Sequence, residues 1–336
     1  MPAVLSVPGS SPELAGTDEN QLTMQLLDEA WVLSDGKPGM ENQALGLAEA
    51  VGLGIRVVRV VPRAPWRFLA PLRLAARLAE NGLSSPWPRL LIATGRQSVP
   101  YSLAIKRASP ATFTVQIQSP GIAARNFGLI VPPRHDHLAG ANVLPTRGAL
   151  HRVTPARLAA EAARFAPALA HLPRPLVAVL IGGDNGVYRL TDAVADRLIA
   201  GLGRIVETEG AGLAVTASRR TSPAIVARLR QALATLPAVM WDNTGDNPYF
   251  GYLGLADHVV VTGDSVSMVS EACATGKPVH VIDLEGGSPK FERFHAGLRA
   301  DGLTRPFAVP LEHWTYAPLD DMALVAAEVR RQIGLA

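Results

Sequence analysis

The stretch VVVTGDSVSMVSEACATGKPV, residues 259–279, decides the fold of this chain. Its first residues, Val259–Val261, predict a buried strand that runs into a polar turn and then into a segment of helical spacing. The turn contains a glycine, and either Asp264 or Ser265 can cap the helix that follows. Gly276-Lys277-Pro278 then ends the helix before the next buried strand. Strand, turn, helix and strand in this order form the repeating unit of a parallel sheet covered by helices.

The predicted helix begins with groups that can hold phosphate. Backbone N–H groups at a helix N-terminus attract anions, and the hydroxyls of Ser265 and Ser267 are expected beside them. Glu271 comes four residues after Ser267, so it shares that helix face and can accept hydrogen bonds from ribose hydroxyls. Taken alone, the stretch is equally well explained as an ordinary connection whose Asp and Ser only cap the helix.

A second loop supports the ligand-binding interpretation. The sequence GGDNG, residues 182–186, follows a predicted strand and has glycines that allow close approach of its backbone to a ligand. Because parallel strands end at one edge of a sheet, the two loops could hold a diphosphate from two sides. A plain glycine turn explains one such loop better than two. Two cations after the next strand would help to neutralise the diphosphate. The predicted donor ligands are Gly182, Gly183, Asp184, Asn185, Thr262, Asp264, Ser265, Ser267, Met268, Glu271, Lys290 and Arg293.

The alternation of strands and helices occurs in two series, which predicts two Rossmann-like α/β domains facing a cleft. A chain of 336 residues also exceeds what one core usually organises. The expected strands are Ala30–Ser34, Ile55–Val60, Arg89–Thr94, Thr112–Gln116 and Phe127–Val131, then Leu176–Ile181, Gly212–Thr216, Val239–Trp241, His258–Val261 and Val279–Ile282. We expect a disordered leader at 1–27, an N-terminal domain at 28–152, a linker at 153–174, a C-terminal domain at 175–319 and a C-terminal helix at 320–336.

The loops of the first series supply candidates for catalysis. LSDGKPG, residues 33–39, lacks the Walker spacing, which argues against ATP hydrolysis. Asp35 or Glu41 could act as a base and Lys37 as an anion ligand, although the loop also reads as two ordinary turns. Arg96 and Gln97 follow the third strand and would suit an anionic substrate group, or a surface turn.

Two further segments carry candidate groups. RHDH, residues 134–137, places histidines beside Asp136, which becomes a third candidate base. We expect no metal there, because no third ligand with helical spacing is present. WDNTGDNPY, residues 241–249, reads as a long polar loop, so that Tyr249 and Phe250 could stack on a nucleobase or pack beneath the loop.

Composition limits the class of partner. The net charge of +3 is scattered and aromatic residues make up 5%, so we expect phosphorylated small molecules rather than nucleic acid. Cys273 is the only cysteine, which excludes an internal disulfide and fits a cytoplasmic location. No apolar run reaches the ~20 residues that a bilayer requires. PWRFLAPLRL, residues 65–74, predicts either a peripheral contact with an anionic inner membrane or helix packing. No redox cofactor is expected, because the G-x-G-x-x-G fingerprint is missing.

Several long strings resemble the mitochondrial fission, elongated-mitochondria protein family, from residue 30 onward. They are WVLSDGKPGMENQ, VPPRHDHLAGANVL, TRGALHRV, GGDN, NPYFGYLGLADHVVVTGDSVSMVSEACATGKPV and PKFERFH. The C-terminal half is also similar to the donor half of MurG-like glycosyltransferases, which implies the glycosyltransferase-B architecture. By that resemblance Glu271 holds the ribose, while Ser265 to Ser267 and Gly183 flank the diphosphate. The chain departs from that group at Asp35–Gly39, where a glycine-rich turn with a histidine would stand.

The resemblance implies metal-independent transfer of a sugar from a nucleoside diphosphate to an acceptor such as a lipid-linked or envelope precursor. The lack of an Asp-x-Asp pair agrees with independence from metal. Two alternatives stay open. The chain could be a non-enzymatic adaptor that kept the fold, or a non-hydrolysing sugar-nucleotide epimerase, which shares this architecture.

Overall fold

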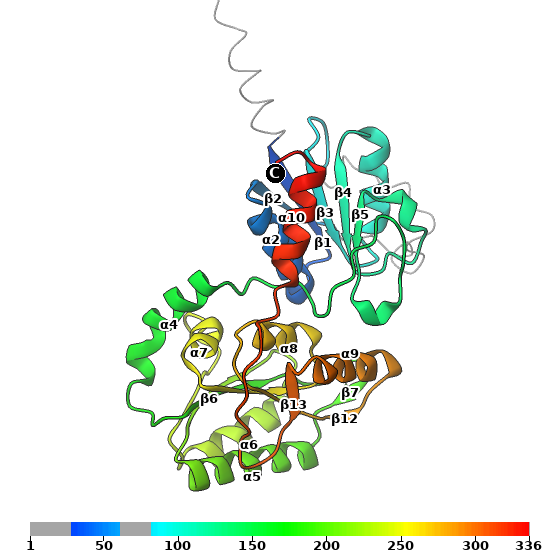
Figure 1. Cartoon of the computed structure of the whole chain (residues 1–336). Helices are drawn as coiled ribbons and strands as arrows, with labels where there is room; N and C mark the ends of the chain where they lie inside the picture. The colour runs from blue at the N-terminus through cyan, green and yellow to red at the C-terminus, as the bar shows by residue number, and fades with distance from the viewer. Residues whose placement is uncertain (1–27, 61–81, 336) are drawn as a thin grey trace, which may run out of the picture.

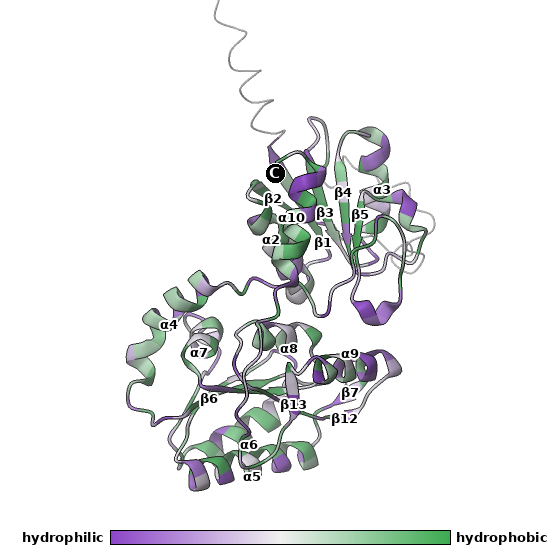
Figure 2. Cartoon of the chain, in the orientation of Figure 1, coloured by the Kyte–Doolittle hydropathy of each residue, from purple (hydrophilic) through white to green (hydrophobic). Residues whose placement is uncertain are grey.

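The computed structural model describes residues 28–60 and 82–335 and shows two α/β domains, one above the other (Figure 1). In Figure 2 much of both sheets is hydrophobic, and hydrophilic residues appear mainly in the loops and on parts of the helices. This is the pattern expected of sheets buried on both faces. The predicted leader 1–27 and the basic apolar segment 65–74 lie outside the described residues. The same holds for the segment Trp66–Glu80, whose sequence has the spacing expected of a helix.

The N-terminal domain is a parallel sheet of order β2-β1-β3-β4-β5 with helices on both faces. Along β1, Ala30 and Val32 face the core under α2, whereas Trp31 and Leu33 face the opposite core. Successive side chains of a strand point to opposite faces of the sheet, so β1 contributes residues to the core on each face. The elements are β1 (Glu29–Ser34), α2 (Pro38–Val51), β2 (Gly54–Arg59), β3 (Leu90–Thr94), α3 (Val99–Ala108), β4 (Phe113–Ile117), η3 (Ala124–Asn126), β5 (Leu129–Val131) and η4 (Arg134–Asp136).

The C-terminal domain is a second parallel sheet, of order β13-β11-β10-β6-β8-β9. One core lies under α5 and α6, and the other lies under α7, α8 and α9. The elements are α4 (Pro155–Leu169), β6 (Leu176–Ile181), α5 (Asp192–Glu209), β8 (Gly212–Ala217), α6 (Pro223–Leu233), β9 (Ala238–Met240), α7 (Tyr249–Leu255), β10 (His258–Thr262), α8 (Val266–Cys273), β11 (Val279–Ile282), α9 (Pro289–Ala300) and β13 (Thr304–Pro306). A separate antiparallel pair joins β7 (Tyr188–Arg189) to β12 (Glu285–Gly286), and α10 (Asp321–Gln332) follows at the end of the described residues.

The predicted strands are all present, with bounds that agree within two residues. The predicted polar loop is present at residues 241–248, but Tyr249 and Phe250 begin the short helix α7, which packs on α4. Two glycines allow this contact, because a Cβ at Gly251 would lie 2.6 Å from the ring of Phe165 and one at Gly254 would lie 2.6 Å from the Leu158 carbonyl. Most of the segment 153–174, predicted to be a linker, is therefore helix α4 (Pro155–Leu169), which packs on α7.

The last helix crosses back to the first domain. Figure 1 shows α10 beside α2, and Val325 and Val329 of α10 join the core of the N-terminal sheet. The Asp321 carboxylate accepts hydrogen bonds from the backbone N–H groups of Arg147, at 2.6 Å, and Gly148, at 3.0 Å. Among the described residues, no helix combines the length and the apolar character needed to cross a bilayer.

Candidate functional site

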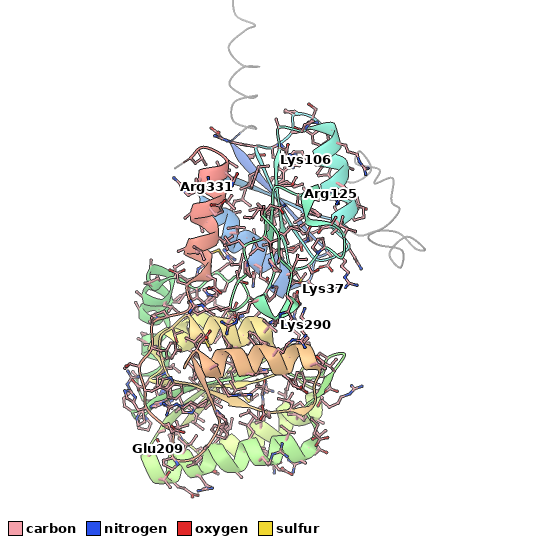
Figure 3. The ribbon with its side chains drawn as sticks, turned by 45° about the vertical axis from the view of Figure 1, so that its right-hand side comes forward. Lys37, Lys106, Arg125, Glu209, Lys290 and Arg331 are labelled. Atoms are coloured by element: carbon pink, nitrogen blue, oxygen red, sulfur yellow. The ribbon has the colours of Figure 1, made fainter. Side chains whose placement is uncertain are left out.

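The strand ends of the two domains face each other. In the C-terminal sheet β10, β6 and β8 are neighbours, so the loops that follow them meet at one edge. In the N-terminal sheet the loops after β1 and β5 reach the same boundary, where Lys37 and Lys290 are labelled in Figure 3. Ligands of open α/β sheets bind beyond the carboxyl ends of the strands, so this boundary is the candidate site.

Asp264 ties the three C-terminal loops together. Its carboxylate is buried and accepts hydrogen bonds from the Thr262 hydroxyl at 2.6 Å and from the Gly183 N–H at 3.1 Å. The Arg220 guanidinium, from the loop after β8, lies 2.6 Å from the same carboxylate. A buried charge is stable only when it is paired and hydrogen-bonded, and these contacts meet that need. Asp264 is therefore a link between loops, while Ser265 caps α8 by accepting the Met268 N–H.

The glycines of the loop after β6 are required by this packing. A Cβ at Gly182 would lie 2.1 Å from Asp264 Oδ1, and one at Gly183 would lie 2.2 Å from the Arg220 carbonyl oxygen. The Gly182 N–H donates to the Thr262 hydroxyl at 2.7 Å. We expected these amides to face a diphosphate. Instead, both are bonded within the protein.

The next two residues are also bonded within the protein. The Asp184 carboxylate accepts the Leu190 N–H at 2.9 Å and pairs with Arg189 at 3.0 Å, and the bond to the Leu190 N–H lowers its pKa most. The Asn185 amide donates to the Asp264 carbonyl and accepts from the Val187 and Tyr188 N–H groups. Both side chains shape the loop, in contrast to the ligand role expected for them.

The N-termini of α2 and α8 converge at the domain boundary. A Cβ at Gly39, in the first turn of α2, would lie 3.5 Å from the Ser267 hydroxyl in the first turn of α8. Within residues 28–60 and 82–335, no hydrogen bond is recorded for that hydroxyl, and α8 carries no acidic residue in its first turn. Met268 packs against the core behind the helix. Two positive helix ends meet here.

The acidic candidates of the first loop are already paired. The Asp35 carboxylate lies 2.5 Å from Lys37 Nζ. Glu41 forms a two-pronged pair with Arg59, at 2.9 and 2.8 Å, and this hydrogen bonding lowers the pKa of Glu41. A carboxylate with a lowered pKa is a poor proton acceptor, so Glu41 is the least suitable of the candidate bases.

Glu271 lies on α8 where the helix face predicted it, but its carboxylate is buried. The Tyr249 hydroxyl donates to Oε2 at 2.6 Å, and burial raises the pKa of Glu271 to about 7. Burial, together with this carboxylate, also raises the pKa of Tyr249. Tyr249 therefore donates a hydrogen bond to Glu271, the residue predicted to bind the ribose. Its ring is half-buried against the neighbouring core, so it is not freely open to stack on a nucleobase. Phe250 packs beneath the Arg157 guanidinium of α4, 5.5 Å from the ring centroid.

A second contact between the domains joins η4 to α9. Lys290 Nζ lies 2.8 Å from the Asp136 carboxylate, so a predicted phosphate ligand and a predicted base neutralise each other. The Arg293 Nε donates to the His135 carbonyl at 3.4 Å. Both ring nitrogens of His135 are buried without a hydrogen-bond partner among the described residues, and burial lowers its pKa to about 4.

The remaining candidates lie at the edge of the site. Arg96 is exposed and Gln97 is half-buried in the loop after β3, where Gly95 approaches Met40 of α2. No group of three or more metal-ligating side chains that could hold an ion is found in the described part of the chain. Arg220 was missed from the sequence. Its only local sign is the pair of arginines in SRRT, residues 218–221, after β8.

Two Rossmann-like domains that face each other in this way define the glycosyltransferase-B architecture. A crystal structure from Listeria monocytogenes, assigned as a UDP-N-acetylglucosamine 2-epimerase, matches with a TM-score of 0.50 and 10% identity, over 92% of this chain and 90% of that one. That likeness shows the fold. A family model described as Mitochondrial fission ELM1 matches residues 38–333, and the chain belongs to this family.

Relatives from a plant and a bacterium agree with the assignment. Mitochondrial fission protein ELM1 of Arabidopsis thaliana is 34% identical over 293 residues, which cover 79% of this chain and 68% of that protein. An uncharacterized protein of Rickettsia prowazekii is 24% identical over 347 residues, which cover 89% of this chain and 97% of that protein.

Proposed function

We propose that this chain binds a nucleoside diphosphate sugar between its two domains and transfers the sugar to an acceptor without a metal. The meeting of the N-termini of α2 and α8 at Gly39 and Ser267 carries the proposal. Each helix end has the partial charge of about half a proton, which favours a bound anion. The first turn of α8 has no acidic residue, and the one in the first turn of α2, Glu41, is paired with Arg59. Lys37 and Lys290 lie at the same boundary (Figure 3), and each could offer its charge to a phosphate by leaving its present partner, Asp35 or Asp136.

The diphosphate is the part of the ligand that this boundary suits. Phosphate oxygens would accept hydrogen bonds from the Ser267 N–H and hydroxyl, and Lys290 would exchange Asp136 for a phosphate. That exchange frees the Asp136 carboxylate on the N-terminal side, where an acceptor would bind. Asp35 or Asp136 would then take the proton of the acceptor hydroxyl, while the helix ends stabilise the leaving diphosphate.

The test is binding of UDP, GDP, CMP and ADP sugars, measured as protection against thermal unfolding and by calorimetry. We expect at least one donor to raise the unfolding midpoint at about a hundred times its Kd, where linkage predicts about 2.7 kcal/mol of stabilisation. If no member of this panel shifts the midpoint at millimolar concentration, the donor site does not exist.

A single substitution separates anion binding from general stabilisation. Ser267→Glu places a carboxylate between the two helix ends, so it should stabilise the free protein by about 0.5 kcal/mol and abolish donor binding. Ala224→Glu is the matched control, because it adds a carboxylate to the exposed first turn of α6, away from the boundary. The control should gain the same stability and bind normally.

One observation favours the second candidate, a non-enzymatic adaptor. The Gly182–Asn185 loop is bonded within the protein, as in a chain that keeps the fold without the chemistry. An adaptor would tolerate Ser267→Glu in cells, whereas a transferase would lose its cellular function while remaining folded.

A further inference from the structure

Arg220 spans the loops at the C-terminal edge of the sheet. It lies in the loop after β8 and reaches across the β6 loop to the carboxylate of Asp264, in the β10 loop. Its Nη1 donates to the Gly183 carbonyl at 3.2 Å and to the Asp184 carbonyl at 3.4 Å, and its Nη2 lies 2.6 Å from Asp264 Oδ2. Three acceptors from two loops thus fix the plane of the guanidinium.

These contacts leave part of the guanidinium unused. A guanidinium has five N–H donors in a rigid fork, and the contacts above account for three of them. The side chain of Arg220 remains 38% exposed, while that of Asp264 is 0% exposed. The guanidinium is therefore open to solvent on one side while it neutralises the buried carboxylate. The donors that these contacts do not use are available to an acceptor from outside the protein.

We propose that Arg220 binds a phosphate of the ligand directly and that the buried Asp264 positions it. The inference rests on the proposed function, because it assigns a ligand to that site. Asp264 directly precedes the cap of α8, so the oriented guanidinium stands at the loop that starts the anion-binding helix. Arginine suits this position because its planar fork can bond a carboxylate and phosphate oxygens at the same time. Lysine would supply a charge without that geometry.

The two roles of Arg220 are separated by removing both charges. Arg220→Gln alone would leave the Asp264 carboxylate buried and unpaired, so loss of binding could follow from misfolding. The double variant Asp264→Asn with Arg220→Gln has no stranded charge and should unfold near the wild-type midpoint. We expect it to bind UDP and inorganic pyrophosphate about tenfold to a hundredfold more weakly than wild type, in calorimetry at fixed ionic strength.

Arg219→Gln is the matched control. Arg219 is the exposed neighbour in the same loop, and its loss removes the same charge; its affinity for both probes should stay within about twofold of wild type. Arg220→Lys keeps a cation for Asp264, so it should fold, and its affinity should fall like that of the double variant. A double variant that binds as tightly as wild type overturns the role of Arg220 alone. A wild-type chain that binds neither probe overturns the proposed function, and this inference with it.

Discussion

The strand-end loops of the two domains are held in different ways. In the C-terminal domain one buried carboxylate, Asp264, joins loops that are far apart in the sequence. In the N-terminal domain Asp35 pairs with Lys37 and Glu41 with Arg59, and the third candidate acid, Asp136, pairs with Lys290 across the boundary. A loop tied to its neighbours moves only with them, whereas a loop closed by a local pair can move alone. We therefore expect the C-terminal half to be the more rigid side of the site and the N-terminal half to be the side that adapts to an acceptor.

The comparison is tested most strongly by Gly183→Ala against Gly36→Ala. A Cβ at Gly183 would meet the Arg220 backbone oxygen at 2.2 Å, so the linked loops must separate, and we expect a loss of about 3 kcal/mol. Gly36 has a positive φ of 80°, and the nearest atom to its added Cβ is 3.9 Å away. Gly36→Ala therefore costs only the strain of placing alanine in the left-handed region, about 1 kcal/mol. Urea unfolding measures both, and equal losses would contradict the difference between the domains.

Two glutamates sharpen the comparison through pH. Burial raises the pKa of Glu271 from 4.5 to about 7, so the folded chain keeps a proton that the unfolded chain has released. The stability contributed by this group is complete below pH 4.5 and is lost as the pH rises through about 7. Glu41 behaves oppositely, because hydrogen bonding to Arg59 lowers its pKa, and its contribution is lost as the pH falls below 4.5.

The measurement is the free energy of unfolding across this pH range. Between pH 4.5 and about 7, wild-type stability should fall by at most about 1.4 kcal/mol per pH unit because of Glu271, and Glu271→Gln should remove this fall. Glu41→Gln should instead reduce only the loss of stability below pH 4.5. Each variant is the control for the other. If Glu271→Gln leaves the neutral limb unchanged, its carboxyl group is ionised in the folded chain.

The smallest effect is expected between the domains. Lys290 is 53% exposed, so its pair with Asp136 should contribute about 0.5 kcal/mol in a double-mutant cycle of Asp136→Asn and Lys290→Gln. High salt should reduce that coupling further. A coupling above about 2 kcal/mol would mean that the contact between the domains is as strong as the link through Asp264. That result would contradict the expectation that the N-terminal half adapts more easily than the C-terminal half.

Local sequence pattern predicted most of the fold because strands and caps leave short-range marks. Ser265 before α8 and the apolar run Val259–Val261 are examples. Helix α9 was missed although Ser288 and Pro289 mark its start, because its cations were interpreted as part of a loop. Helix α7 could not be predicted, since its glycines favour a helix only when α4 packs against them.

The site was predicted less completely, for a physical reason. The glycines at 182 and 183 look like a phosphate loop because close approach of a ligand and close approach of a carboxylate require the same missing Cβ. The partnership of Arg220 with Asp264 joins residues 44 positions apart (264 − 220) and has no periodic trace in the sequence. Glu271 was found because helical spacing placed it, but its burial and its bond to Tyr249 depend on α7.

The return of α10 to the first domain bears on how the protein is made. The core beneath α10 contains residues from β1, β3, β4 and β5 together with Val325 and Val329. On the ribosome that core stays unfinished until residues 321–332 have emerged, after every strand of the second domain. Domains usually fold in the order of synthesis. Here the core of the N-terminal sheet is completed last, so we expect its apolar face under α10 to stay exposed through most of translation.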